Sequence, residues 1–178
     1  SEFSDNCQTR YRRAKSLGGP WLAANDDVFD GRAYYAAKTA SDGENRYMFG
    51  WNPTKSGNDN QPWDWGGNLV VHEIFQQNDG SLSTRMPKAI RNYFTHEIFS
   101  LEIINIKQDD GFSTYPLKVN LGSSYRISMK VRFSGDAVKT GVQLRHNIEN
   151  DDSYAYVINN SKSKFNFSKI PNHPWNYA

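Results

Sequence analysis

Three of the chain's five tryptophans flank one loop, at residues 52–62: Trp51 precedes it, and Trp63 and Trp65 follow it. Tyr34 lies in a strand-like segment upstream. An exposed aromatic ring can stack on the apolar C–H face of a sugar while neighbouring polar groups bind the hydroxyls. The same residue types are commonly buried as anchors of a β-protein core or a domain interface. The sequence leaves both interpretations open, a sugar-facing aromatic platform and an aromatic-rich core.

Carboxyl groups occur in three short clusters, which raise the question of catalysis. A retaining glycoside hydrolase needs two carboxyl groups about 5 Å apart. The clusters lie in turn-like sequence, where aspartate is a common solvent-exposed residue; they are Asp26, Asp27 and Asp30, then Asp109 with Asp110, and Asp151 with Asp152. Asp30 is the most informative, because with Arg32 it stands at the start of a predicted strand. For these two residues a structural ion pair is expected rather than catalysis.

Metal-binding patterns are absent from the sequence. The four histidines show neither HxH nor HxxxH spacing, and the single Cys7 can form neither an internal disulfide nor a metal site alone. No segment resembles a calcium-binding loop. The sequence therefore predicts no metal and no cofactor.

The charge balance is nearly even, with 21 basic and 19 acidic residues and a formal net charge of +2. Such a small excess gives no reason to expect nucleic acid or an anionic membrane as a partner. No run of about 18 apolar residues predicts a transmembrane helix. The basic stretch Arg10–Arg13 has two interpretations, a solvent-exposed strand or loop and a contact with a phosphate or carboxylate.

The elements that would position the aromatic and acidic residues are short antiparallel strands. Asp42-Gly43 and Asn78-Asp79-Gly80 supply the positive φ angles of tight turns. Gly50 lies inside a strand, where a missing side chain allows close approach of a neighbour. Residues 1–90 are predicted to form an antiparallel meander like one blade of a propeller, with strands at Arg32–Thr39, Arg46–Trp51, Asn68–Gln76 and Leu82–Met86.

Residues 91–178 have a different pattern, which predicts a β-sandwich domain. Lys88–Glu97 joins the two parts as a short helix or an irregular linker. The segment Tyr125–Phe133 alternates most clearly between apolar and polar side chains, as a strand with one wet face does. About six strands are predicted, too few for a complete sandwich, so the chain is either a fragment or completed by another copy or segment; they are Ser100–Ile106, Leu117–Leu121, Tyr125–Phe133, Gly141–His146, Tyr154–Asn159 and one starting at Phe165. The predicted fold class is all-β.

The stretch from Asp26 to Pro87 resembles the end of the catalytic module of glycoside hydrolase family 32, the invertases, levanases and inulinases. The resemblance rests on motifs that occur in the family's order over about 60 residues: Tyr34-Tyr35-Ala36-Ala37, Gly50-Trp51, Trp63 to Leu69, His72-Glu73, Asp79-Gly80 and Pro87. It implies that this stretch is similar to the last blade of a five-bladed propeller. The following residues would then correspond to the family's C-terminal β-sandwich, matched by order and strand rhythm rather than by motif.

The departures from the family concern its chemistry. This chain lacks the motifs that carry the family's nucleophilic aspartate and the aspartate of its Arg-Asp-Pro motif. It also lacks the glutamate beside a cysteine, since Cys7 follows Asn6. Ala33 replaces an aspartate that often helps to recognise substrate, and His72 stands where the family often has arginine. The resemblance therefore assigns no catalytic residue here, and the sequence leaves open whether the chain has activity alone.

Three hypotheses follow. The chain is the C-terminal part of a fructan- or sucrose-type glycoside hydrolase, it is a non-catalytic carbohydrate-binding β domain, or it is a protein-interaction module. The resemblance implies a fructose-containing oligosaccharide or polysaccharide as partner, together with the remainder of a longer chain or a second copy, and an extracellular or periplasmic location. The candidate sugar-binding residues are Asp30, Arg32, Tyr34, Trp51, Trp63 and Trp65.

Overall fold

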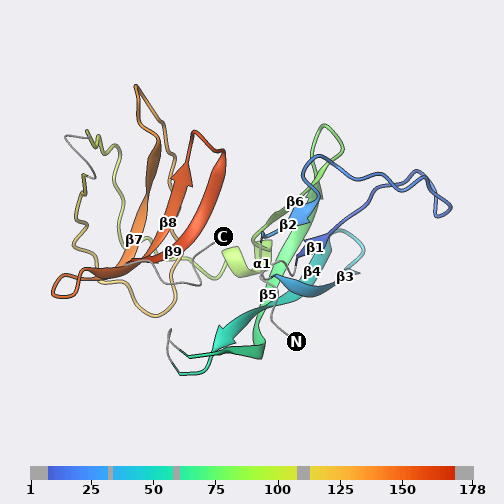
Figure 1. Ribbon diagram of the computed structural model, residues 1–178, viewed down its shortest axis with the longest axis horizontal. Coiled ribbons are helices and arrows are strands. Elements are labelled where there is room, and N and C mark those ends of the chain that lie inside the picture. Colours follow the sequence, from blue (N-terminus) through green and yellow to red (C-terminus); the bar gives the residue numbers. More distant parts are fainter. Residues whose placement is uncertain (1–7, 32–33, 58–60, 108–112, 171–178) are drawn as a thin grey trace. The chain divides into compact units, whose positions relative to one another are not determined.

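The computed structural model describes residues 8–31, 34–57, 61–107 and 113–170. For Trp63 and Trp65 it describes the backbone but not the side chain. Strands hold 42% of the described residues and helix 3%, and the sheets are antiparallel, which confirms the all-β fold class. The chain divides into two compact units, Ser1–Thr95 and His96–Ala178 (Figure 1). We call them the N-terminal and C-terminal units and describe each by itself.

The N-terminal unit is built on a four-stranded antiparallel sheet in the order β3-β4-β5-β6. Its strands follow one another in sequence as a meander: β3 (Tyr35–Ser41), β4 (Arg46–Lys55), β5 (Trp63–Gln76) and β6 (Leu82–Arg85). The tight turns lie where the Asp-Gly pairs predicted them, with φ of 98° at Gly43 and 79° at Gly80. At the first turn the Asp42 carboxylate accepts hydrogen bonds from the backbone N–H groups of Glu44 and Asn45.

The sheet has two faces that we name for their surroundings. On the covered face lie Met48, Gly50, Val70, His72 and Ile74, because Met48 pairs with His72 and Gly50 with Val70 across β4 and β5. Its buried cluster consists of Tyr11, Phe29, Tyr34 and Met48, with Ala24, Ala37, Val70, Ile74 and Leu82 packed against it.

The open face carries the alternate residues of the same strands, among them Phe49, Trp51, Leu69, Val71 and Glu73. Leu69 is 69% exposed on this face, and Phe49 is exposed too. The sheet thus carries apolar side chains on both faces; β1 and β2 pack against the covered face, and on the open face Glu73 accepts a hydrogen bond from the backbone of α1.

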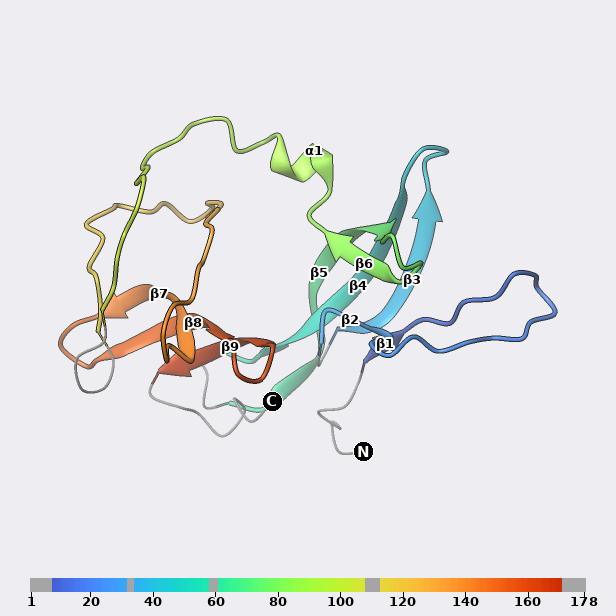
Figure 2. The ribbon, with the colours of Figure 1, turned by 90° about the horizontal axis from the view of Figure 1, so that it is seen from above.

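The covered face is packed against the short antiparallel pair β1 (Thr9–Arg10) and β2 (Val28–Phe29). Between these strands the chain runs out as a long arm, closed by an isolated bridge between Arg13 and Leu22 (Figure 2). Tyr11, which directly follows β1, and Phe29, in β2, place their rings 4.9 Å apart between centroids. This small element therefore supplies two of the four buried core side chains.

The one helix among the described residues is α1 (Lys88–Arg91), a single turn after Pro87. It matches the helical option for the predicted linker. At four residues it is far shorter than the roughly 20 needed to span a bilayer, and no described helix is long and apolar enough to do so.

The C-terminal unit contains one three-stranded antiparallel sheet in the order β7-β8-β9. Its strands are β7 (Lys139–Asn147), β8 (Asp152–Asn159) and β9 (Lys164–Ile170), close to the last three predicted strands. Aromatic rings line one face, with Tyr154 stacked on Phe167 at 5.8 Å and Tyr156 on Phe165 at 5.6 Å.

The strands predicted at Ser100–Ile106, Leu117–Leu121 and Tyr125–Phe133 are wrong, because all three segments are irregular. Alternation of apolar and polar residues is necessary for a half-buried strand, but a strand also needs a neighbour for its backbone hydrogen bonds. Here the apolar side chains stay in solvent, with Met129 49% exposed. A second sheet is missing from the described part of this unit, so the sandwich stays a prediction.

Candidate functional site

The structure brings Asp30, Tyr34 and His72 together at one end of the covered face. Asp30 Oδ2 lies 2.8 Å from His72 Nε2, within hydrogen-bond distance. The Asp30 side chain is 37% exposed and that of His72 is 18% exposed. The ring of Tyr34 meets the imidazole edge to face, with centroids 5.1 Å apart. We call these three residues the Asp30 cluster.

Tyr34 is the most firmly held residue of the Asp30 cluster. It is 0% exposed, and its hydroxyl lies 3.3 Å from the carbonyl oxygen of Met48 and 3.2 Å from that of Val70. Its backbone is held as well, because the Thr9 hydroxyl donates to the Tyr34 carbonyl at 2.9 Å. The side chain thus ties the start of β3 to the middle of β4 and β5.

The environment of the Tyr34 hydroxyl favours the protonated phenol. Burial, and to a smaller extent the negative charge of Asp30, raise its pKa to about 12, and a hydrogen bond with the Gly50 backbone partly opposes both. At neutral pH the group is therefore a neutral hydrogen-bond donor, and it shapes the site rather than transferring protons.

The backbone at Asp30 turns its carboxylate toward the sheet. Asp30 and Gly31 both have positive φ angles, 57° and 68°. Aspartate tolerates this left-handed conformation better than most residues, and glycine adopts it freely. A non-glycine residue held in this region at a half-exposed carboxylate is a feature that often marks a functional site.

Trp51 lies on the open face, away from the Asp30 cluster. Its ring contacts Tyr35 edge to face at 5.5 Å between centroids, and it pairs with Leu69 across β5. Because successive side chains on a strand point to opposite faces, Trp51 is separated from Tyr34, which covers Gly50 on the other side. Trp51 and Tyr34 therefore do not form one aromatic platform.

Three predicted residues cannot be placed in the site. Arg32 lies outside the described residues, so its ion pair with Asp30 stays a prediction. The backbones of Trp63 and Trp65 belong to β5, where Trp63 pairs with Lys55, but their side chains are not among those described. The observed partner of Asp30 is His72, 42 residues away in sequence.

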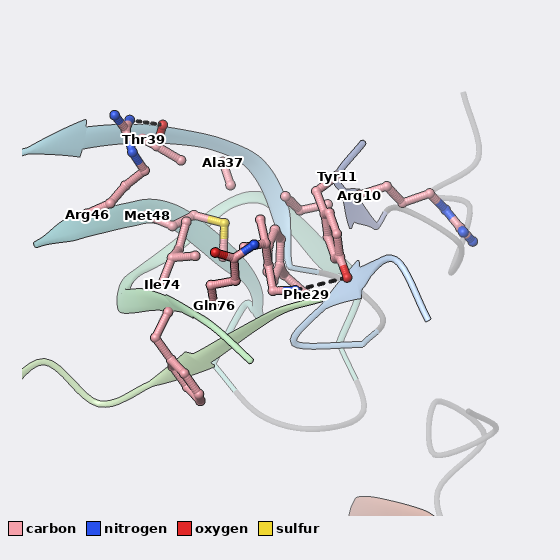
Figure 3. A pocket seen from close by; sticks show the side chains of 12 residues that line it. Arg10, Tyr11, Phe29, Ala37, Thr39, Arg46, Met48, Ile74 and Gln76 are labelled. Carbon is pink, nitrogen blue, oxygen red and sulfur yellow. Dashed lines mark hydrogen bonds between the residues drawn. The ribbon is translucent and has the colours of Figure 1, made fainter. Parts of the chain in front are cut away.

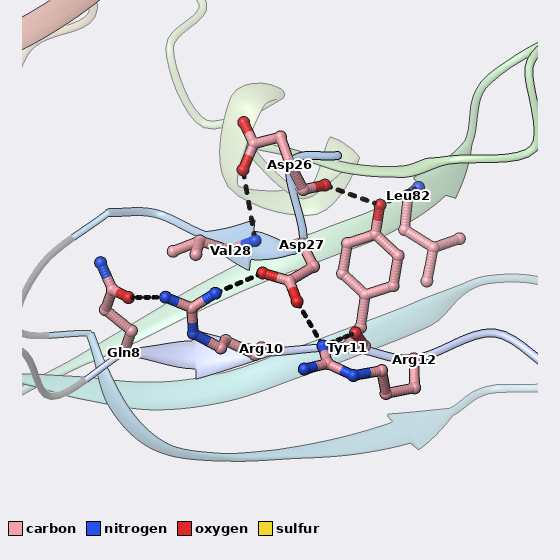
Figure 4. Close-up of polar contacts among 8 residues, drawn as sticks. All are labelled: Gln8, Arg10, Tyr11, Arg12, Asp26, Asp27, Val28 and Leu82. Carbon is pink, nitrogen blue, oxygen red and sulfur yellow. Dashed lines mark hydrogen bonds and ion pairs between the residues drawn. The ribbon is translucent and has the colours of Figure 1, made fainter. Parts of the chain in front are cut away.

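The other two aspartates of the first cluster have structural roles, but Asp27 is not the solvent-exposed residue that its turn-like sequence predicts (Figure 4). Asp27 is only 7% exposed and binds Arg10 at 2.6 Å and Arg12 through its second oxygen. Asp26 accepts a hydrogen bond from the backbone N–H of Val28. The basic stretch Arg10–Arg13 thus makes a carboxylate contact, and the carboxylate belongs to the chain itself.

Glu73 is a second buried carboxylate, and the sequence does not predict it as a candidate site residue. It is 3% exposed on the open face and accepts hydrogen bonds from Arg85, whose Nε lies 2.9 Å away, and from the Lys88 N–H at 3.3 Å. The Arg85 hydrogen bonds hold the pKa of Glu73 below its usual value. The guanidinium also lies over the Phe75 ring. Glu73 therefore links β5 to its neighbour β6 and to α1.

The Asp30 cluster can bind and orient a polar group, but it holds one carboxyl group where double displacement at a sugar needs two. Within the described residues no group of three or more histidine, cysteine, aspartate or glutamate side chains is placed to hold a metal ion. The arrangement can form hydrogen bonds through an oriented carboxylate that lies beside an imidazole. No protein-family model and no curated protein matches this chain.

Proposed function

We propose that this chain is the C-terminal part of a fructan- or sucrose-type glycoside hydrolase, and that it supplies structure and sugar contacts but no catalytic acid. The observation that carries this proposal is the half-exposed Asp30 carboxylate, held by His72 over the buried Tyr34. The order of motifs from Asp26 to Pro87 and the four-stranded meander support the same function.

A carboxylate that is fixed on one side and open on the other suits adjacent sugar hydroxyls. Oδ2 of Asp30 is engaged by His72, and a carboxylate has several further lone-pair positions that accept hydrogen bonds. Hydrogen bonds to an ionised acceptor are roughly twice as strong as neutral ones. The proposed ligand is a fructose-containing oligosaccharide or polysaccharide, met outside the cell or in the periplasm. The nucleophile and the acid/base would come from elsewhere in a longer protein or from a partner chain.

The test is calorimetric titration of the chain with sucrose, levan and inulin, together with an assay for released fructose. We expect sugar binding without turnover. Asp30→Asn, which keeps the shape and removes the charge, should weaken binding about tenfold, corresponding to one charge-assisted hydrogen bond. Asp136→Asn, at an exposed turn of the C-terminal unit, is the matched control. Unchanged sugar affinity in Asp30→Asn would remove the proposed site.

A second candidate function, protein interaction, is favoured by the open face of the N-terminal sheet. Phe49 and Leu69 are exposed there, beside the partly buried Trp51 and Val71. Contiguous exposed apolar surface commonly marks a protein contact. Sedimentation velocity over a range of concentrations separates the two functions, since a sugar-binding monomer does not change mass. Concentration-dependent association that Leu69→Asp abolishes, without sugar binding, would favour the interaction module.

A further inference from the structure

A hollow lies on the covered face of the N-terminal sheet (Figure 3). Its lining residues do not include Asp30, Tyr34 or His72. Its volume is about 530 Å³, within the range of about 300–1,000 Å³ typical of small-molecule pockets. The floor is the sheet itself, with Ala37, Met48 and Ile74, and the wall is formed by Tyr11 and Phe29 beside β1 and β2.

The wall is fixed to the sheet by hydrogen bonds. The Tyr11 hydroxyl accepts a hydrogen bond from the Leu82 N–H and donates one to the Asp26 carbonyl, both at 3.1 Å. Its ring packs against Phe29. The hollow is therefore preformed, so a ligand would not have to order the wall on binding.

Polar groups lie at the edge of this apolar hollow, and one of them carries a charge that no carboxylate of the described residues neutralises. Arg46 lines the hollow from β4 and donates a hydrogen bond to the Thr39 hydroxyl at 3.1 Å. No ion pair involving Arg46 occurs among the residues that the structure describes. The other arginine at the hollow, Arg10, is already paired with Asp27.

We propose that this hollow binds a small amphipathic carboxylate, with its apolar body against Met48, Ile74 and Phe29 and its carboxylate on Arg46. The apolar lining excludes a sugar as the preferred ligand, because sugar hydroxyls would lose hydrogen bonds to water without replacement. The guanidinium selects an anionic head, since its planar fork matches a carboxylate. This site is independent of the Asp30 cluster.

The test uses three probes that separate head from body: decanoate, decanol and acetate, each titrated calorimetrically into the full chain. We expect decanoate to bind about tenfold more tightly than decanol, which corresponds to one charge-assisted hydrogen bond at a half-exposed site. Acetate should bind too weakly to measure. Equal affinities for decanoate and decanol, or no binding of either at about 1 mM, would overturn the proposal.

Two variants locate the binding. Arg46→Gln removes the charge at an exposed position and should bring the decanoate-to-decanol ratio to about one, whereas Arg132→Gln, an exposed arginine of the C-terminal unit, should leave the ratio unchanged. Ala37→Phe should fill the hollow and abolish binding of both probes, with circular dichroism confirming the fold. A tenfold preference that survives in Arg46→Gln, or full binding by a folded Ala37→Phe, would place the ligand elsewhere.

Discussion

The ring of Tyr34 occupies the space where a side chain at Gly50 would begin. A β-carbon added at Gly50 would lie 2.5 Å from Tyr34 Cζ and 2.8 Å from its hydroxyl oxygen, closer than non-bonded atoms approach. The glycine therefore lets the phenol lie against β4 and reach the carbonyl groups of Met48 and Val70. Because Tyr34 supports His72 and His72 holds Asp30, the position of the candidate site depends on this one missing side chain.

Gly50→Ala should destabilise the N-terminal unit by about 2 kcal/mol, because an added methyl group forces the buried ring to move. Four of the five tryptophans belong to this unit, so urea unfolding followed by tryptophan fluorescence measures the change. Gly66→Ala is the matched control, since nothing lies within 4 Å of a β-carbon at Gly66. Equal stability of the two variants would show that Tyr34 can move away at little cost.

The local parts of this arrangement could be predicted from the sequence. The Asp42-Gly43 and Asp79-Gly80 turns fix which strands pair, because a tight turn leaves the chain no other register. The close approach at Gly50 follows from a glycine inside a strand. These signals lie within a few residues of what they determine, so a single sequence is sufficient to read them.

The remaining features depend on contacts between distant residues. Nothing in the neighbourhood of Asp30 or His72 indicates that they meet, since they are 42 residues apart. Across the register shift between Tyr35 and Lys38, where Ala36 has a φ of 52°, alternation no longer predicts which later side chains of β3 share the face of Tyr34. Tyr125–Phe133 fails as a strand for a related reason, because its pattern cannot show whether a partner strand is present.

The buried phenol of Tyr34 should ionise at a higher pH than an ordinary tyrosine. Burial raises its pKa to about 12 in the folded chain, whereas an unfolded tyrosine has a pKa of about 10. Between these values the unfolded state loses a proton that the folded state keeps, so stability is full below about pH 10 and falls as pH rises toward 12. Absorbance titration at alkaline pH should show a late step that Tyr34→Phe lacks, with Tyr47→Phe as the comparison, because a hydrogen bond to Asp42 also raises the pKa of Tyr47. A wild-type titration with no late step would contradict the buried position.

Asp27→Asn should destabilise the N-terminal unit by about 2 kcal/mol, because the carboxylate is buried and forms ion pairs with both Arg10 and Arg12. The two arginines are half exposed and regain hydration, so the loss should be smaller than for a fully buried ion pair. Urea unfolding measures it, with Glu44→Gln at an exposed turn position as control. High salt should reduce the stability of the wild type but change Asp27→Asn little; the same salt response in both proteins would exclude a stabilising ion pair.

Glu73 should make the N-terminal unit sensitive to acid. Hydrogen bonds from Arg85 lower its pKa in the folded state below the ordinary value of 4.5, and the Lys88 N–H adds to the effect while desolvation opposes it. The contribution to stability is therefore present above about pH 4.5 and is lost as pH falls through the lowered folded-state value. Glu73→Gln should be less stable than wild type at pH 7, and the difference should shrink below pH 4.5. Thermal unfolding between pH 3 and pH 7 measures this, with Glu149→Gln as the exposed control. A constant difference between Glu73→Gln and wild type across this range would mean that Glu73 acts by packing and not by its charge.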